Sequence, residues 1–155
     1  GPVTVAWALA VGAVAILVVE ALPRRARVDS LDGITAWLAL GIGCFQCLAL
    51  WPGFSRSAAT IMGGMLLGAQ RKVAAEYSFI AAVPIMVAAT GYEMLGSYSL
   101  FSPSEYLFLA VGFGVSFVAA WAAVKVFIRL LAVTTLRPFA WYRLALAPLV
   151  LLWAT

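Results

Sequence analysis

A short polar segment in a very apolar sequence holds the residues best suited to chemistry. Segment 51–57 reads Trp-Pro-Gly-Phe-Ser-Arg-Ser, and Thr60 follows within the next helical turn. An arginine guanidinium can grip two phosphate oxygens at once, and serine and threonine hydroxyls can donate further hydrogen bonds. Gly53 after Pro52 allows a sharp turn, so that main-chain N–H groups can face a single point. We therefore interpret the segment as a cradle for an oxyanion or phosphate.

The charge of Arg56 supports this interpretation, because the residue lies between two apolar stretches, 34–50 and 58–69. A charged side chain near the centre of a membrane costs at least about 2.5 kcal/mol, and such residues usually face a cavity or a partner. A helix predicted to begin near Ser57 would add unpaired N–H groups and the positive end of its dipole. Together these groups describe an anion site at a helix N-terminus.

A purely structural alternative exists for the same residues. Ser57 could be an ordinary N-cap, and Arg56 could form an ion pair with Glu76 or Glu93. The motif coincides, however, with undersized helices, a Pro-Gly break and membrane depth, and this combination favours binding. Glu20, like the other two glutamates, is interpreted as an interfacial or helix-end charge rather than a catalytic group.

Composition decides the class of protein that carries this segment. Of the 155 residues, 65% are hydrophobic and 10% are charged, against about 45–50% and about 25% in a soluble domain. These figures exclude a water-soluble fold and intrinsic disorder. The sequence has no histidine, which excludes a histidine base or a histidine metal site within it. The net charge of +4 is typical of the positive-inside bias, and no nucleic-acid partner is expected.

The apolar runs predict an all-α integral membrane protein in a single membrane domain over residues 1–155. Four runs suit membrane-spanning helices: 3–22, 73–95, 105–130 and 139–154. At the helical rise per residue, stretches 34–50 and 58–69 reach only about 26 and about 18 Å, short of the hydrocarbon core of roughly 30 Å. They predict a re-entrant helix pair over 34–70, with the signature loop 51–57 inside the membrane. Cys44 and Cys47 are interpreted as buried free thiols.

The distribution of lysine and arginine predicts the orientation. Positive residues gather in the loop at 24–27, at 71–72 and between 125 and 137, whereas the N-terminus, the loop at 96–104 and the C-terminus contain none. By the positive-inside rule the charged side is cytoplasmic. The re-entrant pair therefore enters from the cytoplasmic side, with its tip pointing outward.

Three stretches resemble one known family. The run Gly43–Gly68, which contains Pro-Gly-Phe-Ser-Arg-Ser-Ala-Ala-Thr, closely resembles the second signature of the bacterial undecaprenyl pyrophosphate phosphatases. Arg71–Phe79 with Pro84 continues the likeness, and Phe139–Arg143 is similar to the C-terminal signature. The resemblance implies a multi-pass protein of the bacterial inner membrane built from two inverted repeats, each with a re-entrant helix pair. It implies hydrolysis of undecaprenyl diphosphate to the monophosphate, which recycles the lipid carrier of cell-wall synthesis, and a link to antibiotic resistance.

The sequence departs from the family pattern in two ways. The first signature, with its glutamates and histidine, is absent, so the chain resembles the C-terminal half of a longer protein and is expected to be inactive alone. The missing N-terminal half is then its partner, beside the polyprenyl diphosphate and the membrane, and a homodimer is left open. Ala58 stands where the family usually has glycine. A divalent cation, Mg²⁺ or Ca²⁺, fits the family, but no complete metal-binding motif is visible in this sequence.

The resemblance also suggests roles for the residues. Arg56 would hold the diphosphate as a catalytic residue, aided by Ser55 and Ser57, while Gly53, Thr60 and Arg143 would bind the substrate. Ser57 as a nucleophile would need a base that this sequence does not obviously supply. Arg143 has an alternative role as a side chain that extends to the membrane interface. As a function, a transporter or flippase for lipid phosphates could use the same cradle.

Overall fold

The computed structural model describes residues 1–23, 25–97 and 102–153. The described part consists of helices, their connections and one isolated β-bridge, between Val28 and Ala69. The elements in chain order are α1 (Pro2–Ala21), the 3-10 helix η1 (Leu31–Gly33), α2 (Ala36–Gln46), the 3-10 helix η2 (Cys47–Leu50), α3 (Arg56–Leu66), α4 (Arg71–Ser97), α5 (Pro103–Val133) and α6 (Arg137–Trp153). The all-α architecture predicted from the sequence is confirmed, whereas its place in an inverted repeat stays a prediction.

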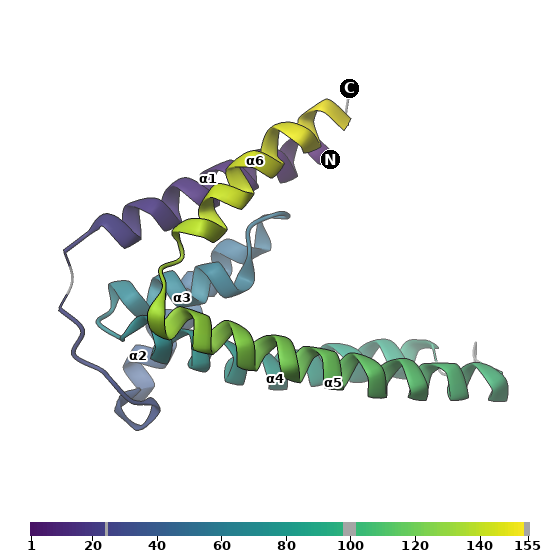
Figure 1. Cartoon of the computed structure of the whole chain (residues 1–155). Helices are drawn as coiled ribbons and strands as arrows, with labels where there is room; N and C mark the ends of the chain where they lie inside the picture. Colours follow the sequence, from purple (N-terminus) through teal and green to yellow (C-terminus); the bar gives the residue numbers. More distant parts are fainter. Residues whose placement is uncertain (24, 98–101, 154–155) are drawn as a thin grey trace.

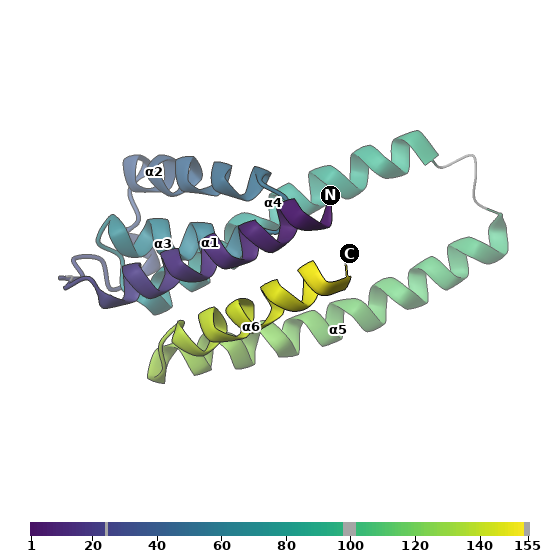
Figure 2. The same cartoon turned by 90° about the horizontal axis from the view of Figure 1, so that it is seen from above.

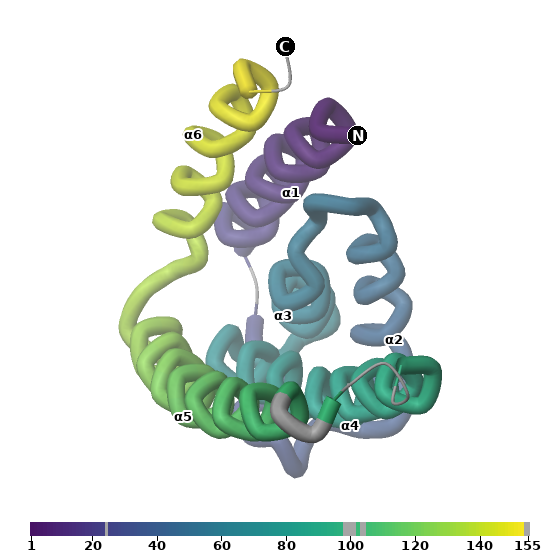
Figure 3. Tube along the Cα trace, turned by 90° about the vertical axis from the view of Figure 1, so that its right-hand side faces the viewer, coloured from purple at the N-terminus to yellow at the C-terminus, as the bar shows by residue number. Residues whose placement is uncertain are grey.

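Two pairs of helices form two diverging arms (Figure 1). Helices α1 and α6 run antiparallel in one arm, with the start of α1 and the end of α6 close together at its tip, and α4 and α5 form the other. The view from above separates the four helices and shows α2 beside α3 (Figure 2). Helix α3 packs against α1, α2 and α4 and lies inside the ring of the other helices (Figure 3). The candidate loop is therefore held between the arms.

Three helices are long and apolar enough to cross a membrane: Pro2–Ala21, Arg71–Ser97 and Glu105–Val133. The 17 residues of α6 are fewer than a full crossing usually needs. None of the apolar window of α5 is buried against the described residues. This helix therefore presents its apolar surface to lipid or to protein outside the described chain.

The hairpin follows from the break at Pro52. Helices α2 and α3 have 11 residues each, and η2 continues α2 as far as Leu50. Gly53 adopts a φ of 96°, in the left-handed region that favours glycine. A Cβ at this position would lie 2.8 Å from the carbonyl oxygen of Val5, so the loop also approaches α1 too closely for a side chain. The two short helices lie where the sequence predicted them, and their re-entrant placement in a membrane stays a prediction.

Small residues let the helices of the first arm approach closely. Ala8 and Ala13 of α1 and Ala140 of α6 are fully buried. In a membrane, close packing of such residues replaces the hydrophobic effect as a driving force for helix association. The sequence interpretation of Cys44 and Cys47 was wrong in one respect: both thiols are free, but both residues are exposed on the hairpin.

A buried ion pair joins the arms where they meet. The Arg71 guanidinium donates from Nε to Glu20 Oε1 at 2.8 Å and from Nη2 to Oε2 at 2.7 Å. Glu20 Oε1 also accepts the N–H of Leu136 at 3.0 Å, and Arg71 Nη1 donates to the carbonyl of Thr134 at 2.9 Å. The Glu20 side chain is only 2% exposed. Glu20 is a helix-end charge, as the sequence indicated, since α1 ends at Ala21, but its carboxylate is buried in an ion pair rather than exposed at an interface.

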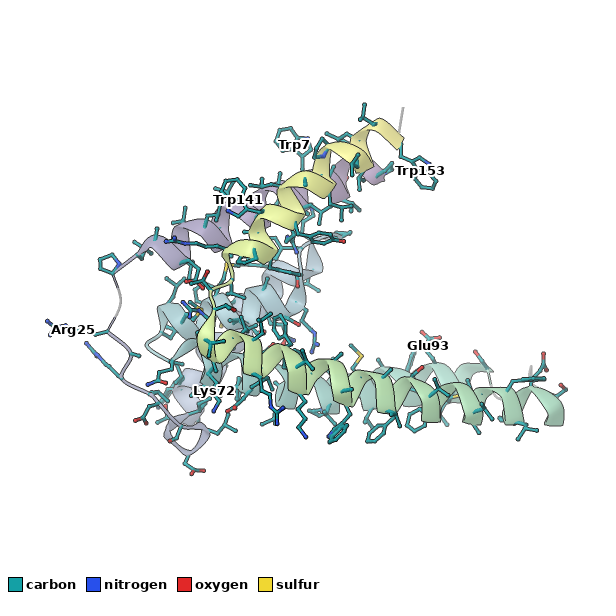
Figure 4. All side chains as sticks on the ribbon, viewed as in Figure 1. Trp7, Arg25, Lys72, Glu93, Trp141 and Trp153 are labelled. Carbon is teal, nitrogen blue, oxygen red and sulfur yellow. The ribbon has the colours of Figure 1, made fainter. Side chains whose placement is uncertain are left out.

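Two positively charged side chains lie at one end of the molecule. Arg25 and Lys72 lie at the end where the arms meet, whereas Glu93 and Trp153 lie toward the two separate tips (Figure 4). This arrangement agrees with a cytoplasmic end rich in positive charge. Arg24 and residues 98–101 of the loop predicted at 96–104 lie outside the described residues.

The orientation can be tested by cysteine labelling in intact cells. In a background with Cys44 and Cys47 replaced by alanine, Arg25→Cys should react only after the membrane is permeabilised. Glu93→Cys should react with an impermeant reagent added outside, since it is exposed toward the opposite end. Labelling of both positions from the same side would contradict the orientation.

Loss of the buried ion pair should destabilise the fold strongly. Removal of the Glu20 carboxylate leaves the Arg71 guanidinium, which is 27% exposed, without its ionic partner and the Leu136 N–H without its acceptor, at a cost of about 1–3 kcal/mol for each lost partner. Glu20→Ala should therefore lower the melting temperature in detergent far more than Glu76→Ala. Glu76 pairs with Lys72 at 3.7 Å in a more exposed setting and serves as the matched control. Equal shifts for both variants would show that the buried pair does not organise the fold.

Candidate functional site

The candidate site begins at the N-terminus of α3. The Ser55 hydroxyl caps the helix by accepting the N–H of Ala58 at 3.3 Å, and Arg56 is the first helical residue. The helix predicted to begin near Ser57 begins at Arg56, whereas the alternative of Ser57 as the N-cap is wrong, because the N-cap is Ser55. Helix capping by one side chain satisfies only one of the four N–H groups at a helix start. The others are available to a ligand.

Arg56 has an unsatisfied guanidinium nitrogen at this helix start. Its Nη1 atom is buried and has no hydrogen-bond partner within the described chain. The structural alternative required an ion pair with Glu76 or Glu93, and neither is found: Glu76 pairs with Lys72, and Glu93 lies far along α4 (Figure 4). A buried donor without a partner costs about 1–3 kcal/mol or more for a charged group. The site is therefore poised to gain a strong acceptor.

Thr60 connects the cradle to α4. Its hydroxyl lies 3.0 Å from the carbonyl oxygen of Arg56, 3.1 Å from that of Ser57 and 2.5 Å from the hydroxyl of Ser78. Thr60 is 2% exposed and Ser78 is 1% exposed. A threonine hydroxyl has one proton to donate, so these internal contacts already engage it. A direct contact of Thr60 with substrate stays a prediction, while its support of the first turn of α3 is visible.

Arg143 reaches the loop from α6. Its Nη2 donates to the carbonyl of Gly53 at 3.0 Å and to the carbonyl of Ala8 in α1 at 3.2 Å. The residue is 3% exposed, so the alternative of a side chain extending to the interface is wrong. A Cβ at Gly12 would lie 2.7 Å from the same nitrogen, which explains why glycine faces the guanidinium. Arg143 thus holds the backbone of the loop against α1 and α6.

A cavity of about 210 Å³ opens beside the cradle. Its walls come from α3, α4, α5, α6 and the connection before α6. The lining residues are Ser55, Ser57, Ala58, Ile61, Phe79, Phe127, Leu136 and Phe139. Two serines of the loop are thus in contact with a space that is otherwise apolar.

The structure brings most of the predicted site residues together. Ser55, Arg56 and Ser57 are consecutive, Thr60 lies in the next turn, and Arg143 reaches the loop through the carbonyl of Gly53. Their roles toward a substrate stay predictions.

Two supporting residues were not singled out from the sequence. Ser78 belongs to a stretch that already resembled the family, and this likeness was a usable signal for it. Gly12 gave no local signal, because its importance depends on a guanidinium from a distant helix.

No group of three or more His, Cys, Asp or Glu residues that could hold a metal ion occurs among the described residues. The nearest charged groups of the cradle are arginines, which repel cations. The divalent cation suggested by the family resemblance stays a prediction.

Fold and site together define a class: a helical membrane protein with a short helical hairpin, whose loop carries an unpaired arginine at a helix N-terminus. The comparison with known proteins specifies the family. The model of the family described as "Bacitracin resistance protein BacA" matches residues 1–149. The chain belongs to this family.

Relatives with the same printed name support the assignment. The chain is 73% identical over 150 residues to the undecaprenyl-diphosphatase of Maridesulfovibrio salexigens, covering 97% of this chain and 57% of the relative. It is 69% identical over 152 residues to that of Oleidesulfovibrio alaskensis, covering 98% and 57%. It is 56% identical over 147 residues to that of Lawsonia intracellularis, covering 94% and 55%. The chain thus spans a little over half the length of these curated relatives.

The packing of Gly12 against Arg143 gives a sharp test of the loop anchor. Gly12→Ala should push the guanidinium away from the Gly53 carbonyl and lower the stability by about 1–3 kcal/mol, the usual cost of overpacking. Gly91→Ala is the matched control, because a Cβ there meets nothing within 4 Å. Alanine is the better helix former by up to about 1 kcal/mol, so this control should be neutral or stabilising. Thermal melts of the two variants in detergent measure the difference, and similar melts would contradict the anchor.

Proposed function

We propose that the chain forms part of an enzyme that hydrolyses undecaprenyl diphosphate to undecaprenyl phosphate and phosphate. The enzyme would act in the bacterial inner membrane and recycle the lipid carrier of cell-wall synthesis. Membership of the BacA family and the name shared by its relatives support this function. The observation that carries the proposal is the buried, unpaired Nη1 of Arg56 at the start of α3.

The proposed reaction is phosphoryl transfer to water. The oxygen of water bonds to the terminal phosphorus, the bond from that phosphorus to the bridging oxygen breaks, and the bridging oxygen remains on the lipid monophosphate. Negative charge spreads over the oxygens of the transferred group during this step. Arg56 and the free N–H groups of α3 would offset that charge. The proton lost by water needs a base, which a chain without histidine would receive from the rest of the protein.

The neighbouring hydroxyls would orient the diphosphate. Ser55 uses its oxygen to cap α3, which leaves its proton free to donate to a phosphate oxygen. Ser57 would donate from the opposite side of Arg56. Thr60 and Ser78 would hold the first turn of α3 in place, and Arg143 would fix the loop through Gly53. The groups that would stabilise the transition state are thus in position before the substrate binds.

The proposal includes partners beyond this chain. The N-terminal portion present in the relatives would supply the histidine that the chain lacks, together with further carboxylates, and the chain alone would be inactive. Carboxylates from that portion would also be needed to hold a Mg²⁺ or Ca²⁺ ion against the diphosphate. A homodimer is compatible with the exposed apolar surface of α5.

Replacing Arg56 by lysine separates geometry from charge. Lysine keeps the charge but offers a compact ammonium instead of a planar fork that binds two oxygens. Loss of one such donor typically costs on the order of a hundred- to a thousandfold in rate. Full-length Arg56→Lys should therefore hydrolyse undecaprenyl diphosphate at least about a hundredfold more slowly than wild type. The measurement is phosphate release in detergent, with folding checked by thermal melt.

Arg25→Lys, at an exposed loop position, is the matched control and should leave turnover unchanged. A folded Arg56→Lys variant within about threefold of wild-type kcat/KM, roughly 0.65 kcal/mol, would refute the cradle. Movement of the lipid between leaflets without phosphate release would instead indicate a flippase. Both readouts are obtained from the same protein in liposomes.

A further inference from the structure

We propose that the cavity beside the cradle binds the isoprene units of the substrate nearest to its diphosphate. This inference rests on the proposed function and assigns the part of the site that recognises the lipid chain. The cavity of about 210 Å³ holds two serines at one part of its lining and apolar side chains elsewhere. Its occupant therefore needs an apolar body with a polar group attached.

The apolar walls come from four helices and from the connection before α6, which contributes Leu136. Phe79 extends from α4, Phe127 from α5 and Phe139 from α6, while Ile61 belongs to α3. The rings of Phe79 and Phe127 meet edge to face, with centroids 5.8 Å apart and planes at 85°. This arrangement is favourable for aromatic pairs and gives the wall a fixed shape. None of the residues that line the cavity carries a charge.

The polar part of the lining determines how an occupant is oriented. Ser55 and Ser57 belong both to the cavity and to the loop, and Arg56 stands between them in the chain. A molecule whose apolar body fills the cavity thus places an attached phosphate at the start of α3. A polyprenyl diphosphate meets this requirement, because its first isoprene unit is bonded directly to the charged diphosphate.

A short, stiff chain fits this cavity better than a flexible one. Isoprene units contain double bonds and methyl branches, so they lose less rotational freedom on binding than a saturated acyl chain of the same length. Phe139 is 37% exposed, so the cavity is not sealed on that side. The remainder of a long prenyl chain could leave past this ring toward the apolar exterior. The cavity would therefore distinguish substrates by the chemical structure of their first isoprene units and not by the total length of the prenyl chain.

The experiment compares two diphosphates that share a head but differ in chain. Full-length protein is assayed with geranyl diphosphate, which carries two isoprene units, and with methyl diphosphate, which carries none. Phe127→Ala removes one wall and should lower kcat/KM for geranyl diphosphate by about tenfold, the effect of losing part of a buried aromatic contact. The value for methyl diphosphate should change less than about twofold.

Phe117→Ala is the matched control. Phe117 lies on the same helix, is 62% exposed and does not line the cavity. It should leave both substrates unaffected. An equal loss on both diphosphates for Phe127→Ala would reduce the residue to a structural role, and no loss on either would show that the cavity does not bind the chain. Both outcomes would overturn the inference while the proposed hydrolysis stands.

A binding measurement covers the case in which wild-type protein hydrolyses neither diphosphate, so that the proposed function fails. Geranyl phosphate with a diazirine in its first isoprene unit should label Phe79, Phe127 or Phe139, and excess undecaprenyl phosphate should suppress the labelling. Labelling confined to positions outside the cavity would overturn the inference. Equal labelling by a fatty acid that carries the same diazirine would assign the cavity to bulk membrane lipid and would also overturn it.

Discussion

The buried pair of Glu20 and Arg71 is the contact on which the arrangement of this fold depends. It binds the end of α1 to the start of α4, and the same two side chains hold the backbone that leads from α5 to α6. Four helices are thus fixed at one point, from which the two arms diverge. The ion pair also limits how far α1 and α4 can move relative to each other. Because α3 packs against both helices, the pair helps to set the position of the candidate site. A neutral contact would tolerate such movement, whereas a bidentate pair has one geometry.

Three arginines share this apolar setting, and the fold treats each differently. Arg71 faces a carboxylate, Arg143 donates to two main-chain carbonyls, and Arg56 keeps a buried nitrogen without an acceptor. A charge near a membrane interior needs compensation from some group. The first two are compensated within the protein and serve its architecture. The third has no such compensation for its Nη1 within the described residues, and this contrast with the other two arginines is what supports the proposed ligand-binding role of Arg56.

The accuracy of sequence reasoning depended on how local the relevant interactions are. The helices and the break at Pro52 could be predicted, because apolar runs and a Pro-Gly pair act over a few residues. The role of Arg56 as an unpaired cation also followed from its neighbours. The partners of Glu20 and Arg143 could not be predicted, since their contacts join residues 51 and 135 positions apart. Gly12 was overlooked for the same reason: its missing side chain matters only where a guanidinium from α6 arrives.

The contact between Arg143 and Gly53 has a consequence for biosynthesis. The loop emerges from the ribosome 90 residues before the arginine that fixes it. At typical rates of translation, roughly five to twenty seconds therefore pass between synthesis of the loop and synthesis of its anchor. During this interval the loop lacks the contact that fixes its backbone. The loop therefore reaches its final arrangement only after α6 has been made.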